Sequence, residues 1–310
     1  MSLPAIVLTA GLGTRLDPLT RLVAKPAVPL GRLSLIERVL AWVRLQGVTD
    51  VVLNLHHRPA TLTTIVGDGA HLGLRVRYSW EQPVLGSAGG PRRALPLIDG
   101  DPVLIVNGDT LSDFALGPMI DAHAASGADV TLAVVPNPDP GHYNGMTIDS
   151  SDRVTGFVPR GHAADSWHFI GVQIAGRRVF DGLADGQAAE TIAGIYRDIV
   201  AAGDGRIRAW HAATSFIDVG TPRDYLRAAL AFADTVDQDQ ASRPYLTRTV
   251  VWPEATLATD VELDGCIVAG AVRLGTGFRG RDAVIVPAAI VTDGDTASVQ
   301  NGVALFPLAP

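Results

Sequence analysis

The chain has 310 residues, of which 47% are hydrophobic, so it can bury the core of one large domain with room for a small second one. The formal net charge of −7 argues against a nucleic-acid-binding surface, so any phosphate site must be local. We expect a cytoplasmic protein without a membrane partner, for three reasons. The chain has a single cysteine (Cys266), it shows no charged-then-apolar leader before Ala5, and it contains no run of about 18 apolar residues.

The first element is an apolar, β-branched run over residues 5–9, which predicts a buried strand. Gly11 and Gly13 follow, and their lack of a Cβ lets the backbone turn sharply and bring its N–H groups against a ligand. Arg15 and Lys25 come next, in a segment that prolines stiffen. Oriented N–H dipoles, a planar guanidinium and a point charge at the carboxyl end of a strand suit a polyphosphate.

A GxG pair alone is common in ordinary turns, and this segment is neither a dinucleotide fingerprint nor a P-loop. The segment lacks the third glycine that a dinucleotide fingerprint needs and the GK[ST] that a P-loop needs. The whole string GxGTRLxPLTxxxxKPxxPL is more specific, because so many fixed spacings rarely coincide in a loop.

This string resembles the signature of the sugar-1-phosphate nucleotidyltransferases, the NDP-sugar pyrophosphorylases. The resemblance implies that the glycine loop, Arg15 and Lys25 hold a nucleoside triphosphate and the sugar phosphate. Thr9 and Ala10 stand where the family usually has Ala and then Ala or Gly. In this stretch we assign nucleotide binding to Ala10, Gly11, Gly13, Thr14 and Arg15.

The chain then alternates strands and helices, which predicts an α/β fold of Rossmann-like type: a mainly parallel sheet with helices on both faces and ligands at the carboxyl ends of the strands. The expected strands are 51–57, 74–80, 102–109, 129–135 and 168–176, with a hairpin over 147–157 and a strand from 216; the expected helices are 35–48, 119–125, 190–203 and one after 222.

Two carboxylates follow predicted strands. Asp109, after Gly108 in VNGDT, and Asp218, in DVGTPRDY, could each simply cap the next helix. Together, beside a cationic glycine loop, they form a plausible Mg²⁺ site, because Mg²⁺ is usually held by one or two carboxylates plus substrate phosphates. The family resemblance implies the same metal role for both, and we assign Gly108 to the nucleotide.

The segment EQPVLGSAGGPRRAL, residues 81–95, is similar to the family's E-x-x-L-G-T-A-G-A-L, which lines the base and ribose. The resemblance therefore assigns nucleotide binding to Glu81, Gly86 and Ser87. A flexible surface loop is the alternative.

One patch departs from the family. Where the family commonly has F-x-E-K-P, the sequence FVPRG places Pro159 and Arg160. Arg160 keeps the charge and can bind a phosphate, whereas loss of the Glu leaves the identity of the sugar open. We assign sugar binding to Asn144, Gly145 and Gly171.

These parts imply a reaction in which an anionic sugar-1-phosphate oxygen attacks the α-phosphorus of an NTP and pyrophosphate leaves. No general base is needed, so Arg15, Lys25 and Arg160 are the catalytic candidates, acting by positioning and charge neutralisation with Mg²⁺. The rivals are a catalytically silent sensor or regulatory subunit of the same fold and a bifunctional enzyme with an acyltransferase β-helix.

The C-terminal part has a different sequence pattern. We place a catalytic domain at 1–234, a polar linker at 235–247 and a second domain at 248–310. Apolar residues recur every six positions there, which predicts a short left-handed parallel β-helix of hexapeptide repeats that packs on the catalytic domain or forms a homo-oligomer. A small β-rich cap is the alternative. The repeats are Val251, Leu257, Leu263 and Ala255, Val261, Ile267, then, after a five-residue step, Val272, Phe278, Val284, Ile290.

The substrates can be narrowed only by resemblance. LGSAGG and the hexapeptide tail are similar to mannose-1-phosphate guanylyltransferase-type members, which we favour. NLHH and residues 137–145 resemble bacterial N-acetylmuramate-1-phosphate uridylyltransferases. A uridylyl- or thymidylyltransferase acting on that sugar or on glucose 1-phosphate is therefore the alternative.

Overall fold

The computed structural model describes residues 3–162, 165–233 and 244–308. Contacts divide the chain into two compact units, one of Met1–Gly11 and Ile36–Ile217 and the other of Leu12–Leu35 and Asp218–Pro310. The residues that follow Gly11 in the GxGTRLxPLTxxxxKPxxPL string thus belong to the same unit as the C-terminal part of the chain. Most of the linker predicted at 235–247 lies outside the described residues.

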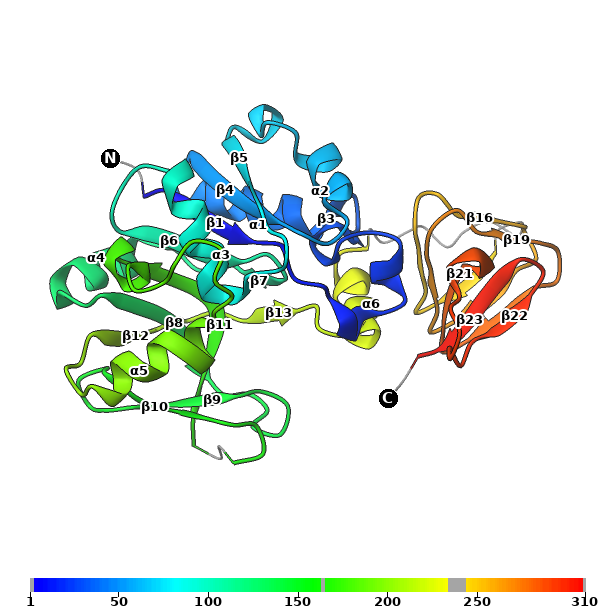
Figure 1. Ribbon diagram of the computed structural model, residues 1–310. Helices are drawn as coiled ribbons and strands as arrows, with labels where there is room; N and C mark the ends of the chain where they lie inside the picture. Colours follow the sequence, from blue (N-terminus) through cyan, green and yellow to red (C-terminus); the bar gives the residue numbers. More distant parts are fainter. Residues whose placement is uncertain (1–2, 163–164, 234–243, 309–310) are drawn as a thin grey trace. The chain divides into compact units, whose positions relative to one another are not determined.

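The first unit is built on a nine-stranded sheet (Figure 1). Its centre is parallel: β1 (Ala5–Leu8) lies between β4 (Asp50–Leu55) and β6 (Val103–Asn107), and β5 (Arg75–Trp80) pairs with β4. The first three residues of β1 are fully buried, as an apolar strand covered on both faces requires. The expectation of an α/β fold with a parallel centre is confirmed.

The remainder of this sheet is mixed. Strand β11 (Trp167–Ala175) runs antiparallel to β6, to β8 (Val130–Pro136) and to β9 (Gly145–Ile148). Strand β10 (Val154–Val158) pairs with β9 as the predicted hairpin, and β12 (Ile207–His211) runs parallel to β8. The short β7 (Thr110–Ser112) follows β6 outside this sheet. The first unit ends within β13 (Phe216–Asp218), whose last residue, Asp218, belongs to the second unit.

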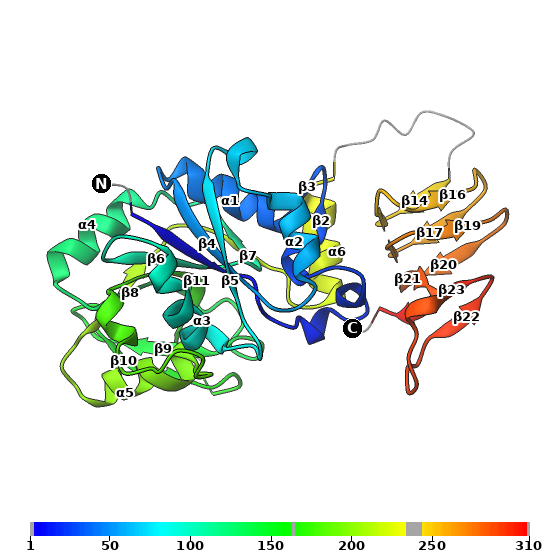
Figure 2. The same cartoon turned by 45° about the horizontal axis from the view of Figure 1, so that its top comes forward.

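Helices cover both faces of the sheet. Figures 1 and 2 show α1 (Leu35–Leu45) and α3 (Gly86–Ala94) on opposite faces. The sequence analysis did not predict α3 or α2 (Pro59–Val66), whereas α4 (Gly117–Ser126) lies where expected. The helix predicted at 190–203 is broken at Gly194 (φ −126°, ψ −108°), so a π-helical turn (Thr191–Ile195) precedes the short α5 (Tyr196–Ala201).

A continuous apolar core lies between the sheet and α3. It joins sheet residues such as Ile6 and Ile105 to Ala88 of α3 and to the fully buried rings of Phe180 and Tyr196. Small residues on α3 let the helix lie close to the strands.

The second unit begins with residues 12–31, which we call the signature loop. It contains three single-turn 3₁₀ helices, η1 (Thr14–Leu16), η2 (Leu19–Arg21) and η3 (Lys25–Ala27). A small hairpin of β2 (Pro29–Leu30) and β3 (Leu33–Ser34) follows. Helix α6 (Pro222–Ala231) contacts η1 and β2 and begins with a capping box between Thr221 and Asp224.

The C-terminal strands of this unit form three small parallel sheets. Tyr245 pairs with Glu262 and Glu262 with Arg279, so equivalent residues of successive strands are 17 apart. The same 17-residue offset separates the paired residues of the other two sheets. It equals two six-residue steps and one five-residue step of the apolar repeat. The strands are β14 (Tyr245–Thr247), β17 (Glu262–Asp264) and β20 (Arg279–Arg281); β15 (Val250–Val251), β18 (Ile267–Val268) and β21 (Ala283–Pro287); and β16 (Thr256–Leu257) and β19 (Arg273–Leu274).

The chain ends with elements that the repeat did not predict. After a 3₁₀ turn, η8 (Ala288–Ile290), the strands β22 (Ser298–Gln300) and β23 (Val303–Pro307) form a hairpin. Strand β23 pairs antiparallel with β21 over five residues. This pairing covers the open edge of the last parallel strand.

Candidate functional site

Gly13 and Lys25 of the signature loop lie against each other. Gly13 has a left-handed backbone (φ +63°), and a Cβ built on it would lie 2.8 Å from Cγ2 of Thr20 and 3.0 Å from Cβ of Lys25. Lys25 is 7% exposed, which is unusual for a lysine. Only glycine fits here, and its absent side chain leaves room for the stem of Lys25.

Arg15 lies beside Asp218 in the same unit. A Cβ on Gly220 would lie 3.1 Å from Oδ2 of Asp218 and 3.5 Å from Nη1 of Arg15. Arg15 itself is exposed, whereas Asp218 is half-buried. Two motifs about 200 residues apart in the sequence thus bring a guanidinium and a carboxylate to one glycine turn. The predicted nucleotide residue Thr14 is exposed next to Arg15.

Asp109 lies two residues after β6 in the first unit, at the edge of the sheet where β1 also ends. The Gly108 N–H donates 2.9 Å to the carbonyl of Leu8, and a Cβ on Gly108 would lie 2.7 Å from that oxygen. Gly108 is therefore required for the close approach of two strand ends. The half-buried Asp109 follows directly, and the buried Ala10 continues β1 at the same edge.

Glu81 belongs to a buried chain of hydrogen bonds that the sequence analysis missed. Its Oε1 accepts from Nδ2 of Asn54 at 2.7 Å and its Oε2 from the Leu85 N–H at 2.7 Å. Asn54 Oδ1 accepts in turn from the Thr9 N–H at 2.6 Å. Both carboxylate oxygens of Glu81 thus hold the ends of β1 and β4 to the start of α3. The signal was Asn54, a polar residue inside the apolar strand VVLNL.

The start of α3 is held by a second segment, residues 187–191. The Ser87 N–H and Oγ donate to Oε2 of Glu190 at 3.1 and 2.5 Å, and Ser87 Oγ accepts from the Thr191 N–H at 2.8 Å. A Cβ on Gly86 (φ +77°) would lie 2.7 Å from the carbonyl of Ala189. The small residues of the predicted nucleotide patch therefore pack against the protein's own backbone, and no sequence signal linked these segments.

Two of the three predicted sugar residues, Asn144 and Gly145, lie near Arg160. Oδ1 of Asn144 accepts from the Arg160 N–H at 3.0 Å, and Nδ1 of His168 donates to the carbonyl of Asn144 at 3.1 Å. Gly145 pairs with Val158 in the β9–β10 hairpin. Arg160 and Asn144 are both exposed, so these side chains are accessible.

His168 is part of a group of stacked rings beside Asn144. Its imidazole lies 4.4 Å from the ring of Tyr143 and 5.1 Å from that of Phe216. Burial is the main cause that lowers the pKa of His168, and the hydrogen bond to Asn144 opposes it. Gly171 (φ +80°) lies elsewhere on β11, where a Cβ would lie 2.9 Å from Cβ of Asn107.

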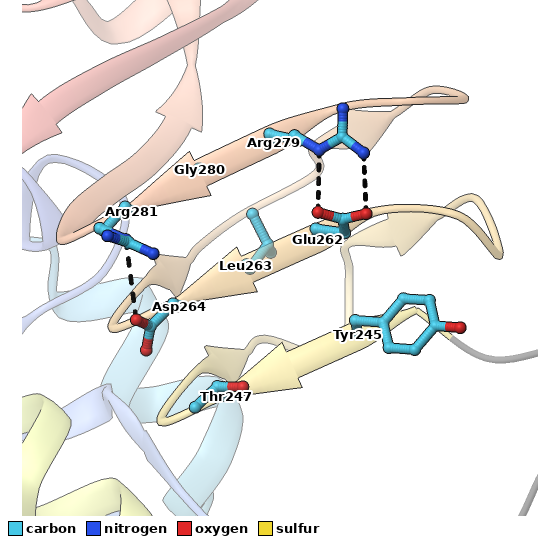
Figure 3. A pocket seen from close by; sticks show the side chains of 8 residues that line it. All are labelled: Tyr245, Thr247, Glu262, Leu263, Asp264, Arg279, Gly280 and Arg281. Carbon is cyan, nitrogen blue, oxygen red and sulfur yellow. Dashed lines mark hydrogen bonds and ion pairs between the residues drawn. The ribbon is translucent and has the colours of Figure 1, made fainter.

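A hollow of about 620 Å³ on the β14–β17–β20 sheet is lined by none of these residues (Figure 3). Arg279 binds Glu262 there through two hydrogen bonds of 2.8 Å, and Arg281 lies 3.8 Å from Asp264. Because these charges neutralise each other on the protein, the hollow offers no net charge to a phosphate.

Within residues 3–162, 165–233 and 244–308, no three His, Cys, Asp or Glu side chains group closely enough to hold a metal ion. Carboxylates suit Mg²⁺, and Asp109 and Asp218, the pair predicted from the sequence, are two of the described acids at strand ends. Over the same described residues, no helix is both long and apolar enough to span a membrane.

Comparison with known proteins identifies the family. The nucleotidyl transferase family model matches residues 4–235. A mannose-1-phosphate guanylyltransferase of Mycobacterium tuberculosis is 30% identical over 283 residues, which cover 91% of this chain and 79% of that protein. An N-acetylmuramate α-1-phosphate uridylyltransferase of Neisseria meningitidis is 32% identical over 193 residues, 60% of this chain and 80% of that protein.

The fold also matches a solved structure. HddC from Yersinia pseudotuberculosis, crystallised with GMP-PN, superposes with a TM-score of 0.64 at 22% identity. The match covers 74% of this chain and all of that one.

Proposed function

The chain belongs to the nucleotidyl transferase family and is a sugar-1-phosphate nucleotidyltransferase, and we propose that it transfers guanylyl from GTP to mannose 1-phosphate, yielding GDP-mannose and pyrophosphate. The proposal for these substrates is supported by the relative that matches 91% of the chain, which is a mannose-1-phosphate guanylyltransferase. The observation that carries the site is the convergence of Arg15 and Asp218 on the Gly220 turn.

In the proposed mechanism, an oxygen of the sugar phosphate attacks the α-phosphorus in line. The new P–O bond forms as the bond to the β-phosphate oxygen breaks, and the electron pair leaves with pyrophosphate. The attacking oxygen is already anionic, so no side chain has to remove a proton.

The protein contributes positioning and positive charge. Arg15, exposed beside the loop glycines, binds the triphosphate through its planar guanidinium. Lys25, held along Gly13, and Arg160, next to Asn144, bind the phosphates that become joined. Asn144, Gly145 and Gly171 are proposed to line the sugar, and Ala10, Gly11, Gly13, Thr14, Glu81, Gly86, Ser87 and Gly108 to surround the nucleotide.

We propose Mg²⁺ as the cofactor, with Asp109 and Asp218 as its ligands. The ion would supply charge neutralisation on the triphosphate. The test is to replace each acid by Asn, with Asp121→Asn on exposed α4 as the control. Both site variants should lose about 10²- to 10³-fold in kcat with Mg²⁺ present, as removal of a charge-stabilising group does. Full activity of either variant would exclude the replaced residue as a ligand of the metal ion.

The deciding assay for substrate measures pyrophosphate release with Mg²⁺, a panel of NTPs including dTTP, and several sugar 1-phosphates. GTP with mannose 1-phosphate should give the highest kcat/KM. UTP with N-acetylmuramate 1-phosphate is the second candidate, because the 32% identical relative is a uridylyltransferase for that sugar. Absence of release with every pair would instead favour a silent regulatory subunit.

We also propose a catalytic domain at 1–234, a linker at 235–247 and a second domain at 248–310. In this proposal the three C-terminal sheets form a left-handed parallel β-helix, whose first strand, β14, takes in the last three residues of the linker. The 17-residue offset between paired strands supports this proposal. We further propose that the protein is cytoplasmic and forms homo-oligomers through this domain. Sedimentation of the full chain over a range of concentrations tests the last point, since a mass that stays at 32.5 kDa would contradict it.

A further inference from the structure

We infer that the C-terminal segment, residues 244–308, holds the signature loop in shape, with Asp295 acting through Arg21 and Trp252 acting through Tyr225 as positioning residues. The inference rests on the proposed role of this loop in phosphate binding. It concerns how the two loop cations, Arg15 and Lys25, are kept in place.

The first contact is made by Arg21 of η2, which lies between the two cations in the sequence. Its Nη2 donates 2.8 Å to Oδ1 of Asp295, and its Nη1 donates 3.1 Å to the carbonyl of Ile290. Its Nε donates 2.8 Å to Oδ1 of Asp17, and its guanidinium lies 5.5 Å from the ring centre of Phe306. The Arg21 guanidinium therefore connects the loop both to its own Asp17 and to Asp295, 274 residues further along the chain.

These bonds are shielded. The Arg21 side chain is 22% exposed and that of Asp295 is 12% exposed. The hydrogen bond from Arg21 is the largest cause that holds the pKa of Asp295 well below its usual range. Charge-assisted bonds of this kind are stronger than neutral ones and fix the geometry of both partners.

The second contact is a relay of two hydrogen bonds. The indole Nε1 of Trp252 donates 2.7 Å to the hydroxyl of Tyr225, which donates 2.8 Å to the carbonyl of Pro29. Tyr225 is fully buried and Trp252 is 2% exposed. Because one hydroxyl both accepts and donates, the position of the Trp252 ring sets the position of Pro29 at the end of the loop.

The loop has little internal order of its own. Its three 3₁₀ turns are each a single turn, and such short turns cost more backbone entropy than their few hydrogen bonds recover. The two external contacts bracket Lys25, and the first lies six residues after Arg15. Weakening either contact should therefore let Arg15 and Lys25 occupy a wider range of positions. Neither change removes a charge from the site.

The first test is hydrogen exchange of the ligand-free full chain, which needs no assumption about substrate. Asp295→Asn removes the ion pair, and Trp252→Phe keeps a ring but removes the indole N–H. Each variant should raise the exchange rate of the loop amides, such as those of Leu16 and Ala27, by about 2- to 10-fold, the value of one hydrogen bond.

Matched controls remove equivalent bonds elsewhere. Glu262→Gln breaks the ion pair with Arg279 on the C-terminal strands, and Trp42→Phe removes an indole bond of 3.1 Å to the carbonyl of Phe114 in the first unit. Neither should change exchange in the loop. Unchanged exchange in both test variants would overturn the inference, whatever the enzyme's substrate proves to be.

The second test is steady-state kinetics with the NTP that the wild-type protein uses best. Asp295→Asn and Trp252→Phe should raise the KM for the NTP by about 2- to 10-fold. Tyr225→Phe removes both hydrogen bonds of the relay, so it should raise this KM at least as much as Trp252→Phe does. Faster loop exchange with unchanged kcat and KM would reduce the contacts to a structural role and also overturn the inference. A wild type inactive with every NTP would refute the proposed function, while the exchange data would still decide whether the loop is held.

Discussion

The side-chain amide of Asn54 donates a hydrogen bond of 2.7 Å to Oε1 of Glu81, and both residues are less than 5% exposed. The bond connects the end of β4 with the residue that follows β5. Through Thr9 and Leu85 the same chain of bonds reaches the end of β1 and the start of α3. A Cβ on Gly90 would lie 2.6 Å from this Oε1, so the glycine of α3 is part of the arrangement.

Replacing Glu81 by Gln should destabilise the first unit. Asn54 Nδ2 and the Leu85 N–H are both donors, whereas Gln offers one oxygen and one NH₂, so one donor would face another donor. Leaving a buried donor unsatisfied costs about 1–3 kcal/mol in the free energy of unfolding, measurable by urea denaturation. Glu262→Gln, at an exposed ion pair, should leave this free energy unchanged; an equal loss in both variants would contradict the prediction.

The sequence predicted the strands better than the helices. Apolar runs such as residues 5–8 can only be buried strands in so short a length, and β1, β4 and β6 lie where expected. Helix α3 was missed because GSAGGPRRA has three glycines and a proline, which individually disfavour a helix. The burial of Ala88 and the bond from Leu85 to Glu81 outweigh that preference, and both depend on distant segments.

In the candidate site, too, local features were predicted from the sequence and contacts between distant segments were not. Each candidate residue could be proposed from the sequence because its motif is local, such as glycine followed by Asp at a strand end. The contacts of Glu190 with Ser87 and of Asp295 with Arg21 join segments more than 100 residues apart. Nothing in the spacing of either residue indicates its partner, because such contacts follow from tertiary packing alone.

Gly11→Ala should separate binding from stability. A Cβ on Gly11 would meet no atom within 4 Å, and its backbone is not left-handed, so the variant should keep the wild-type melting temperature. Close approach of a triphosphate to this backbone would make the added methyl obstructive, and the KM for the NTP should rise about tenfold or more.

Two glycines provide the comparison for Gly11. Gly117→Ala, equally open but on α4, should change neither quantity, whereas Gly13→Ala should lower the melting temperature because its φ is +63°. An unchanged KM in Gly11→Ala would remove Gly11 from the nucleotide site.

His168 should make the fold sensitive to acid. Because burial lowers its pKa in the folded state, the unfolded chain binds the proton more readily. The free energy of unfolding therefore falls as the pH drops below about 6.5 and stops falling once the pH is below the folded pKa. His168→Phe keeps a ring against Tyr143 but cannot titrate, so it should lose less stability between pH 8 and pH 5.5.

The measurement for His168 is the urea midpoint of both proteins at the two pH values. The buried His123, whose pKa burial also lowers, is present in both proteins and cancels in the comparison. Equal losses in wild type and variant would show that His168 is not the titrating group.

Gly220→Ala should impair catalysis more than folding. The added Cβ would lie 3.1 Å from Oδ2 of Asp218, 3.2 Å from Oδ2 of Asp224 and 3.5 Å from Nη1 of Arg15. Asp224 is fixed, because the same Oδ2 accepts from the Thr221 N–H at 3.0 Å in the capping box of α6. The displacement must therefore fall on Asp218, the group proposed to bind the metal, whereas Arg15 stays at an ordinary contact distance.

A shift of a few tenths of an ångström in such a group should lower kcat/KM by about 10- to 100-fold, since catalysis here depends on positioning. Pyrophosphate release by Gly220→Ala is compared with that of Gly275→Ala, which lies in the same unit with nothing within 4 Å of its Cβ position. The control should retain wild-type kcat/KM. Wild-type activity in Gly220→Ala as well would mean that Asp218 tolerates displacement, which a ligand of the proposed metal ion could not do.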